Sequence, residues 1–236
     1  MLMRDPLRVA VAQPRCVPYN VAVNAVAHAA AIRSANCRVV VFPELSLTGY
    51  EMDAPSMALE DPRLMPIVEA CAATGSVALV GAPVNGERGQ AHIAMLAVDG
   101  TGATVVYRKQ WVASTESERF TPGSQPTVLK IDGWRLGLAI CKDTSVPQHA
   151  ADTAALGMDA YVAGILLTSE ETALPDERAR RVAADHRVWV VLASFAGSTG
   201  GGYDQAAGCS GIWTWDGVAI AQAGPATGAI ACATLS

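Results

Sequence analysis

Short apolar runs alternate with longer alanine-rich or polar segments along the first part of the chain. The runs LRVAVAQ at 7–13 and RVVVF at 38–42 are rich in valine, which is typical of strands buried on both faces. Between them, residues 21–35 contain no glycine or proline and follow Asn20, a favourable N-cap residue. The pattern therefore predicts a strand, a helix and a strand in that order.

The rest of the chain continues this alternation and then changes to hairpins. A proline at position 66 leaves the start of one helix open, because proline is tolerated only in the first helical turn. Asp-Gly pairs at 132–133 and 216–217 predict tight turns, and residues 208–224 predict a hairpin that closes the chain. The remaining predicted strands are 76–81, 91–98, 104–109, 127–131, 134–140, 159–166 and 188–195, and the remaining predicted helices are 62–74, 147–156 and 176–186.

Buried strands that alternate with helices, followed by hairpins, predict an α/β fold with mixed sheets and outer helices. So many strands would make a very large single sheet, which favours two packed sheets. No linker or low-complexity segment interrupts the pattern, so residues 1–236 are interpreted as a single domain. In α/β folds ligands bind at the carboxyl ends of strands, and the residues that follow each strand are therefore the first candidates for a site.

Composition narrows the class of protein. Of the 236 residues 51% are apolar and 17% are charged, which is enough for a large core and argues against disorder. A net charge of −5 without a basic patch argues against nucleic acid as a partner. No signal-peptide pattern is present, and no apolar run approaches the ~20 residues that cross a bilayer. We therefore expect a soluble protein without a membrane partner.

The six cysteines, at positions 16, 37, 71, 141, 209 and 232, are scattered without paired spacing. Neither a disulfide framework nor a metal site is predicted from them. Unpaired cysteines are typical of a reducing compartment, so we expect the protein in the cytoplasm.

Three reactive side chains each follow an apolar strand: Glu44, Lys109 and Cys141. Taken singly, a charge at a strand end marks the start of solvent, and a lone cysteine is usually a small core residue. Together they have a chemical logic. A thiol of pKa about 8.5 needs a base or a positive field to become a nucleophile, and a carboxylate can accept its proton. A lysine can stabilise the anion that forms when a thiolate attacks a carbonyl.

A cysteine–histidine pair is the competing chemistry. His149 is the nearest histidine in sequence to Cys141, and at a helical rise the eight-residue gap spans about 12 Å. This distance is too long for a hydrogen bond. His28, His92 and His186 lie in predicted helices or strands and are interpreted as ordinary partly buried or surface residues. The pattern disfavours a histidine base.

Three stretches resemble the signature blocks of the nitrilase superfamily, the carbon–nitrogen hydrolases. They are FPELSLTGY at 42–50, YRKQWV…ESERFTPG within 107–123, and GLAICKD at 137–143, and they occur in the expected order. The similarity extends from RVAVAQ near the start of the chain to GCSGIWTWDG near its end. The resemblance implies a four-layer α-β-β-α sandwich of two mixed sheets flanked by helices, and a homodimer or larger homo-oligomer.

The resemblance also implies roles for individual residues. Glu44 would be the general base, Lys109 the lysine that stabilises the oxyanion, and Cys141 the nucleophile. Glu116 aligns with a second glutamate of the family, and the backbone N–H of Lys142 would complete the oxyanion site. Such a reaction passes through a thioester and needs no metal or organic cofactor.

Departures from the family pattern bear on the substrate. True nitrilases typically have Cys-Trp-Glu where this chain has Cys-Lys-Asp at 141–143, which favours an amide over a nitrile. Thr144 and Ser145 stand where one type of N-carbamoyl hydrolase has paired arginines. We therefore expect an amidase for a small linear amide, with an N-carbamoyl amide hydrolase or a nitrilase as the alternatives. An inactive homologue acting as a binding subunit is disfavoured, because Glu44, Lys109 and Cys141 are all intact.

Four smaller questions stay open at this stage. Glu116 and Glu118 lie two residues apart, and at least one is expected to be a solvated loop charge. Asp143 is expected to fix the turn after Cys141. The glycine-rich segment 193–202 either lets backbone approach the site or is a flexible connection. Four aromatic residues are assigned either to the pocket or to the core: Trp111, Tyr203, Trp213 and Trp215.

Overall fold

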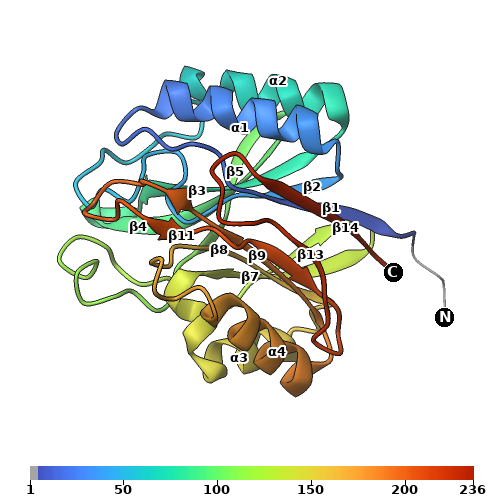
Figure 1. Cartoon of the computed structure of the whole chain (residues 1–236). Helices are drawn as coiled ribbons and strands as arrows, with labels where there is room; N and C mark the ends of the chain where they lie inside the picture. Colours follow the sequence, from blue (N-terminus) through green and yellow to red (C-terminus); the bar gives the residue numbers. More distant parts are fainter. Residues whose placement is uncertain (1–4) are drawn as a thin grey trace.

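The computed structural model describes residues 5–236 and shows two six-stranded sheets packed face to face (Figure 1). The first sheet has the strand order β14-β1-β2-β3-β4-β5, in which β1, β2 and β3 run parallel and the other pairs are antiparallel. Its strands are β1 (Leu7–Ala12), β2 (Val39–Val41), β3 (Val77–Asn85), β4 (Ala91–Asp99), β5 (Gly102–Arg108) and β14 (Ile230–Leu235).

The second sheet repeats this mixed arrangement. Its strand order is β13-β12-β9-β8-β7-β6, with β7, β8 and β9 parallel and the remaining neighbours antiparallel. Its strands are β6 (Val128–Ile131), β7 (Trp134–Ile140), β8 (Ala160–Ile165), β9 (Trp189–Ser194), β12 (Gly211–Trp213) and β13 (Ala219–Gln222). A separate short pair consists of β10 (Ala196–Gly197) and β11 (Ala206–Ala207).

Helices cover the outer face of each sheet and complete four layers. Figure 1 shows α1 (Val21–Ala35) and α2 (Met65–Thr74) above the first sheet, and α3 (Pro147–Ala155) and α4 (Leu174–His186) below the second. The four-layer α-β-β-α sandwich predicted from the sequence is confirmed. None of the helices within 5–236 has the length and apolar character needed to span a membrane.

The strands are apolar on both faces because each face meets a different layer. In β1, Val9 and Val11 pack in the core between the two sheets, whereas Ala10 and Ala12 pack under α1 and α2. This explains why the strand sequences read as continuous apolar runs rather than as alternating ones. A third apolar cluster lies between the second sheet and its helices.

Most predicted boundaries agree with the structure to within two or three residues. A 3₁₀ turn at Pro62–Leu64 precedes α2, so Pro66 lies in the first turn of that helix, where its missing N–H is tolerated. The turn between β6 and β7 has positive φ at both Asp132 and Gly133, the geometry that favours Asp-Gly in a two-residue hairpin.

The prediction that residues 208–224 close the chain is wrong. They form the hairpin of β12 and β13, but β14 follows and pairs antiparallel with β1, with Leu7 opposite Leu235. The strand IACATL is short and carries little β-branched character, so its pattern alone does not identify it. Pairing with β1 stabilises it and places β14 at the edge of the first sheet, next to β1 (Figure 1).

Candidate active site

The three predicted reactive side chains meet between the two sheets. Glu44 lies just beyond the end of β2 and Lys109 directly follows β5, both in the first sheet. Cys141 directly follows β7 in the second sheet. The carboxyl ends of strands from two sheets thus converge on one place, as the strand-end rule predicts.

Lys109 is the centre of the cluster. Its Nζ donates to Glu44 Oε1 at 2.6 Å and to both carboxylate oxygens of Glu116 at 2.7 and 2.8 Å. All three side chains are about 1% exposed. A buried lysine between two carboxylates is stable only because each charge has a partner, and removal of one partner would leave an uncompensated charge.

Glu116 is the second glutamate that the structure brings into the site. Its Oε1 accepts a hydrogen bond from the Tyr50 hydroxyl at 2.6 Å, and its Oε2 accepts one from the Ala113 N–H at 2.6 Å. Glu118, two residues on, is exposed. The expectation that at least one of the two is a solvated loop charge is confirmed, and it is Glu118.

The charges of the cluster follow from burial and mutual contact. Burial raises the pKa of Glu44 to about 7 from an ordinary 4.5, although the charge of Lys109 acts in the opposite direction. Burial and the negative charge of Glu44 raise the pKa of the Cys141 thiol. Burial would lower the pKa of Lys109, but the negative charges of Glu44 and Glu116 raise it. At neutral pH the site therefore combines a neutral thiol, a charged lysine and a carboxylate near the midpoint of its titration.

Glu44 has one oxygen free to accept a proton. Its Oε1 is occupied by Lys109, whereas its Oε2 is buried and accepts no hydrogen bond from the described residues. A buried acceptor without a donor is rare in folded proteins and marks a place where a further group interacts. The negative charge of Glu44 acts on the Cys141 thiol, which makes this oxygen a candidate acceptor for the thiol proton.

Two glycines, one in each sheet, leave space for the backbone around Glu44, because a side chain at either position would collide with it. A Cβ on Gly164 of β8 would lie 2.5 Å from the carbonyl oxygen of Phe42 and 2.9 Å from the backbone nitrogen of Glu44. A Cβ on Gly81 of β3 would collide with the backbone of Leu45, the next residue. Leu45 itself has a φ of 51°, which is rare for a branched side chain. The turn that carries Glu44 is held by close packing from both sheets.

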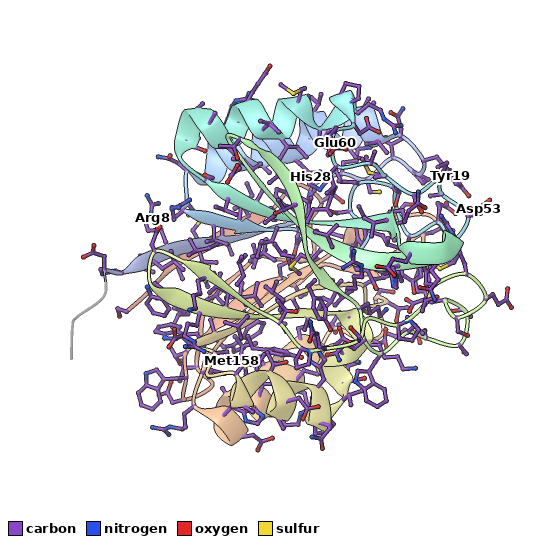
Figure 2. The ribbon with its side chains drawn as sticks, turned by 180° about the vertical axis from the view of Figure 1, so that it is seen from behind. Arg8, Tyr19, His28, Asp53, Glu60 and Met158 are labelled. Atoms are coloured by element: carbon purple, nitrogen blue, oxygen red, sulfur yellow. The ribbon has the colours of Figure 1, made fainter. Side chains whose placement is uncertain are left out.

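A buried histidine supports the same turn from the helical layer. His28 of α1 contacts Ser46 Oγ through Nε2 at 2.9 Å and the Asn24 carbonyl through Nδ1 at 2.6 Å. Figure 2 shows His28 on the inner side of α1, toward the first sheet. It is fully buried, so the expectation of a partly buried or surface residue is wrong. The bond to the carbonyl places the proton on Nδ1, so Nε2 accepts the Ser46 hydroxyl.

Cys141 also lies in a constrained turn. Its φ is 42°, and the residues Cys141–Ser145 form a single 3₁₀ turn between β7 and α3. The Asp143 carboxylate accepts the Ile140 N–H at 2.9 Å and the Trp111 N–H at 2.8 Å. The prediction that Asp143 fixes this turn is confirmed. The thiol is partly exposed, and its Sγ contacts the Leu166 carbonyl at 3.4 Å.

The histidine nearest to Cys141 in sequence is committed elsewhere. His149 Nε2 contacts the Tyr107 hydroxyl and Nδ1 contacts the Tyr161 hydroxyl, each at 2.8 Å. With both ring nitrogens engaged, His149 does not act on Cys141. No group of three or more histidine, cysteine or acidic side chains within the described residues is arranged to hold a metal ion.

A cavity of about 490 Å³ opens above Cys141. Lys109 and Glu116 line it, and so do the apolar side chains of Leu166 and Leu167. Tyr50 and Tyr203 also line it and contact each other edge-on at 5.2 Å between ring centroids. Charged and polar groups form the remainder of the lining: Lys142, Ser145, Thr168, Glu170, Glu171 and Arg178.

The aromatic candidates are divided between three locations. Tyr203 lines the cavity and Trp213 is fully buried in the core. Trp111 is 45% exposed and Trp215 is 42% exposed, so they belong neither to the cavity nor to the core. Each follows the end of a strand at the surface. The glycine-rich segment approaches other backbone closely, since a Cβ on Gly201 would collide with the Tyr50 carbonyl.

Among the lining residues that the sequence did not identify, Tyr50, Glu171 and Arg178 carry groups that can interact with a ligand. Tyr50 is the last residue of the block FPELSLTGY. Its place in a signature block could have indicated a residue of the site. Glu171 and Arg178 follow β8, and the strand-end rule, applied to that strand as well, would have identified the segment.

Comparison with known proteins shows the family of the chain. The model of the family described as Carbon-nitrogen hydrolase matches residues 8–236. A curated relative from Pseudomonas protegens, "Hydrolase in pqqF 5'region", is 27% identical over 178 residues, which is 72% of this chain. An (R)-stereoselective amidase from Pseudomonas sp is 27% identical over 128 residues, which is 52% of this chain. The matched stretches span 62% and 46% of these two relatives.

Solved structures share the fold. A branch 10 member of the nitrilase superfamily from Saccharomyces cerevisiae superposes with a TM-score of 0.86 at 22% identity, over 98% of this chain and 90% of that one. An amidase from Nesterenkonia sp. AN1, solved in complex with butyramide, gives a TM-score of 0.85 at 22% identity, over 97% and 90%.

Proposed function

The chain belongs to the carbon–nitrogen hydrolase family, and on that basis we propose that it is a thiol-dependent amidase for a small linear amide. The observation that carries the proposal is a cluster of three groups beside one cavity. Cys141 and Lys109 line the cavity, and Glu44, which has a free oxygen, is bonded to Lys109. Lys109 is charged between two carboxylates.

In the first half of the reaction Glu44 Oε2 takes the proton of the Cys141 thiol as the sulfur attacks the amide carbon. The pKa of about 7 suits this task, because a general base works best when its pKa lies near the working pH. Lys109 and the backbone N–H of Lys142 stabilise the oxyanion. Glu44 then passes the proton to the leaving nitrogen, and a thioester remains on Cys141.

In the second half water replaces the amine. Glu44, again without its proton, takes one from the water molecule as its oxygen attacks the thioester carbon. The same oxyanion groups act, and the carboxylic acid leaves with the thiol restored. Glu116 takes no proton in this scheme. It holds Lys109 in place and is itself held by Tyr50 and Ala113.

The names of similar proteins support an amide as substrate. One curated relative is an (R)-stereoselective amidase, and a protein of the same fold was solved with butyramide. An N-carbamoyl amide hydrolase or a nitrilase stays the alternative within the enzyme class. An inactive homologue that serves as a binding subunit is the alternative outside it. We also propose a cytoplasmic homodimer or larger homo-oligomer, on the resemblance to the family, which light scattering would test.

A screen of ammonia release tests the proposal. Purified wild-type protein and Cys141→Ala would be incubated with primary amides, N-carbamoyl amino acids and nitriles of matched length. We expect ammonia from amides with the wild type alone. Release from nitriles or carbamoyl compounds instead would select an alternative, and no release from any class would favour the binding subunit.

A further inference from the structure

Two opposite charges lie half-buried in the wall of the cavity above Cys141. Glu171 belongs to the segment between β8 and α4, and Arg178 lies in the second turn of α4. Both side chains are partly exposed and both line the cavity that contains Cys141. The steps proposed above for amide hydrolysis use neither of them.

Hydrogen bonds to threonine residues hold one side of each charged group in place. Arg178 Nη1 donates to Thr144 Oγ1 at 3.1 Å, and Thr144 is part of the turn that follows Cys141. Glu171 Oε2 accepts from the Thr168 N–H at 2.9 Å and from the Thr168 hydroxyl at 3.1 Å. The other guanidinium nitrogens and the other carboxylate oxygen make no hydrogen bond to the residues that the structure describes.

Glu171 and Arg178 do not neutralise each other. No ion pair within 4.0 Å joins either of them to any other group between residues 5 and 236, whereas five close ion pairs between carboxylates and lysine or arginine occur in that range. A charge that loses part of its hydration without gaining a partner is unfavourable. Partly buried charges that have a fixed orientation and no ion-pair partner are suited to bind a ligand that carries the opposite charges.

The two other charged groups of the wall differ from this pair. Lys142 and Glu170 are exposed, and Lys142 Nζ contacts the Val112 carbonyl at 3.1 Å. Exposed charges keep their hydration and gain little from a single ion pair. The half-buried pair is therefore the one that can discriminate between ligands.

Tyr203 lines the same cavity as Cys141 and lies within range of the Glu171 carboxylate. Burial raises the pKa of Tyr203, and the negative charge of Glu171 raises it further. Arg178 reaches the same wall through Thr144, three residues from Cys141.

The size of the cavity fits a ligand longer than a simple amide. At roughly 30 Å³ for each water-sized group, a molecule of ten heavy atoms needs about 300 Å³. The cavity of about 490 Å³ accommodates this with room for water. A four-carbon amide alone would leave much of the wall, including the two charges, without contact.

We propose that the cavity recognises the ω-amide of an α-amino acid, with the amide at Cys141, the α-carboxylate at Arg178 and the α-ammonium at Glu171. The free edge of a guanidinium matches a carboxylate with two parallel hydrogen bonds, and a carboxylate oxygen is a good acceptor for an ammonium. This inference rests on the proposed amidase function. The amide C–N bond breaks, water supplies the new carboxyl oxygen and the proton for ammonia, and the product is an acidic α-amino acid.

Four amides with the same spacing between the amide and the carbon that corresponds to Cα test the inference. They are glutamine with both charges, glutaric acid monoamide with the carboxylate alone, 4-aminobutanamide with the ammonium alone, and butanamide with neither. For the wild type we expect kcat/KM for glutamine to exceed that of each singly charged amide by about tenfold or more, since hydrogen bonds to charged groups discriminate at this level. Equal or better turnover of butanamide overturns the inference and leaves the amidase function intact.

Two conservative variants assign the charges. Arg178→Gln should lower the preference for amides with a carboxylate, and Glu171→Gln should lower the preference for amides with an ammonium, each by about tenfold. Glu171→Gln keeps an oxygen for Thr168, so the turn is preserved. Glu177→Gln is the matched control, because it removes an exposed charge next to Arg178 that does not line the cavity. A purely structural role would lower all four rates together and would contradict the assignment.

A measurement of amide binding without turnover tests the recognition site separately from the proposed amidase activity. Calorimetry with Cys141→Ala measures the affinity of the four amides when no turnover occurs. Tighter binding of glutamine than of butanamide supports the recognition site if this difference is lost when Arg178→Gln is added to Cys141→Ala. If the wild type hydrolyses no amide, the proposed function fails, and equal binding of all four amides then rejects the recognition site as well.

Discussion

The carboxylate of Asp143 accepts a hydrogen bond from the Tyr107 hydroxyl at 2.8 Å, and this contact joins the two strands that deliver the nucleophile and the lysine. Asp143 lies two residues after Cys141, and Tyr107 lies two residues before Lys109. The same carboxylate accepts the N–H of Trp111, two residues after Lys109. One buried side chain therefore sets the distance between the thiol and the ammonium.

The network behind Asp143 has one consistent orientation of its protons. Because Tyr107 donates to Asp143, its oxygen must accept from His149 Nε2, and His149 Nδ1 must then accept from the Tyr161 hydroxyl. Burial lowers the pKa of His149, which agrees with a neutral ring. Every donor thus points toward the carboxylate, which stabilises its negative charge.

Tyr107→Phe should lower kcat by about tenfold and raise KM less, because the lost bond loosens the geometry between Cys141 and Lys109. The free energy of unfolding should fall by about 1–3 kcal/mol, the range for a hydrogen bond to a charged group. Steady-state kinetics and urea unfolding measure the two effects. Tyr161→Phe is the control, since it removes a hydroxyl from the far end and should affect stability more than kcat. Equal losses of kcat in both variants would mean that the bond between Tyr107 and Asp143 has no particular part in positioning Cys141 and Lys109.

Cys141→Ala should abolish turnover while the far-UV circular dichroism stays unchanged, because the side chain is small and lies at a cavity surface. Iodoacetamide should label Cys141 ahead of the buried thiols of Cys16, Cys37 and Cys71. Those three thiols are buried away from the reagent, whereas Cys141 is partly exposed and has Glu44 beside it as a base. Peptide mapping in which loss of activity follows labelling of another cysteine would reject Cys141 as nucleophile.

The rate should depend on the protonation of Glu44. The carboxyl group must be ionised to accept the proton of Cys141, and its pKa is raised to about 7. We therefore expect kcat/KM to rise with pH through about 7 and to level off above it. The rate of Cys141 alkylation should follow the same curve, and Glu44→Gln should remove the rise. A rising limb centred near pH 4.5 would show that Glu44 is not perturbed as the buried cluster requires.

Glu116→Gln should lower kcat by roughly 10²–10⁴, the range typical of positioned catalytic groups, because Lys109 loses one of its two counter-charges. Glu118→Gln should behave as wild type, since that side chain is exposed. The pair is closely matched, with the same substitution two residues apart. Kinetics of both variants check this, and full activity of Glu116→Gln would remove the second glutamate from the site.

The local pattern of apolar and polar residues was sufficient to predict the strands that precede the site residues. Glu44, Lys109 and Cys141 could be found because each follows a continuous apolar strand, and such strands end where ligands bind. The family resemblance added Glu116. The contact between Tyr107 and Asp143 spans 36 residues, and that between His28 and Ser46 joins a helix to a loop. No periodicity encodes such pairs, because they depend on how the layers pack.

The charged pair in the cavity wall was missed for a related reason. Glu171 and Arg178 lie in a polar segment whose charges look like an ordinary solvated helix start. Only the position of α4 against the turn of Cys141 places them in the cavity. β14 was missed because its partner, β1, is at the other end of the chain.

Gly164→Ala should damage catalysis through the backbone of Glu44 alone. The added methyl group would lie 2.5 Å from the Phe42 carbonyl oxygen and 2.9 Å from the Glu44 nitrogen, so the turn must move away from β8. Backbone atoms cannot rotate aside as a side chain can, and overpacking of this kind typically costs about 1–3 kcal/mol of stability. We expect kcat to fall by at least about tenfold, because a displacement of about 1 Å at a reacting group has large effects on rate.

The matched control for Gly164→Ala is Gly224→Ala. A Cβ on Gly224 meets no atom within 4 Å, and its φ lies outside the positive range that disfavours other residues. This variant should keep the activity and stability of the wild type. If Gly164→Ala loses stability but keeps its kcat and its pH dependence, the position of the Glu44 backbone does not limit the reaction. If it loses kcat at temperatures where it is fully folded, the two sheets hold the base in place through this glycine.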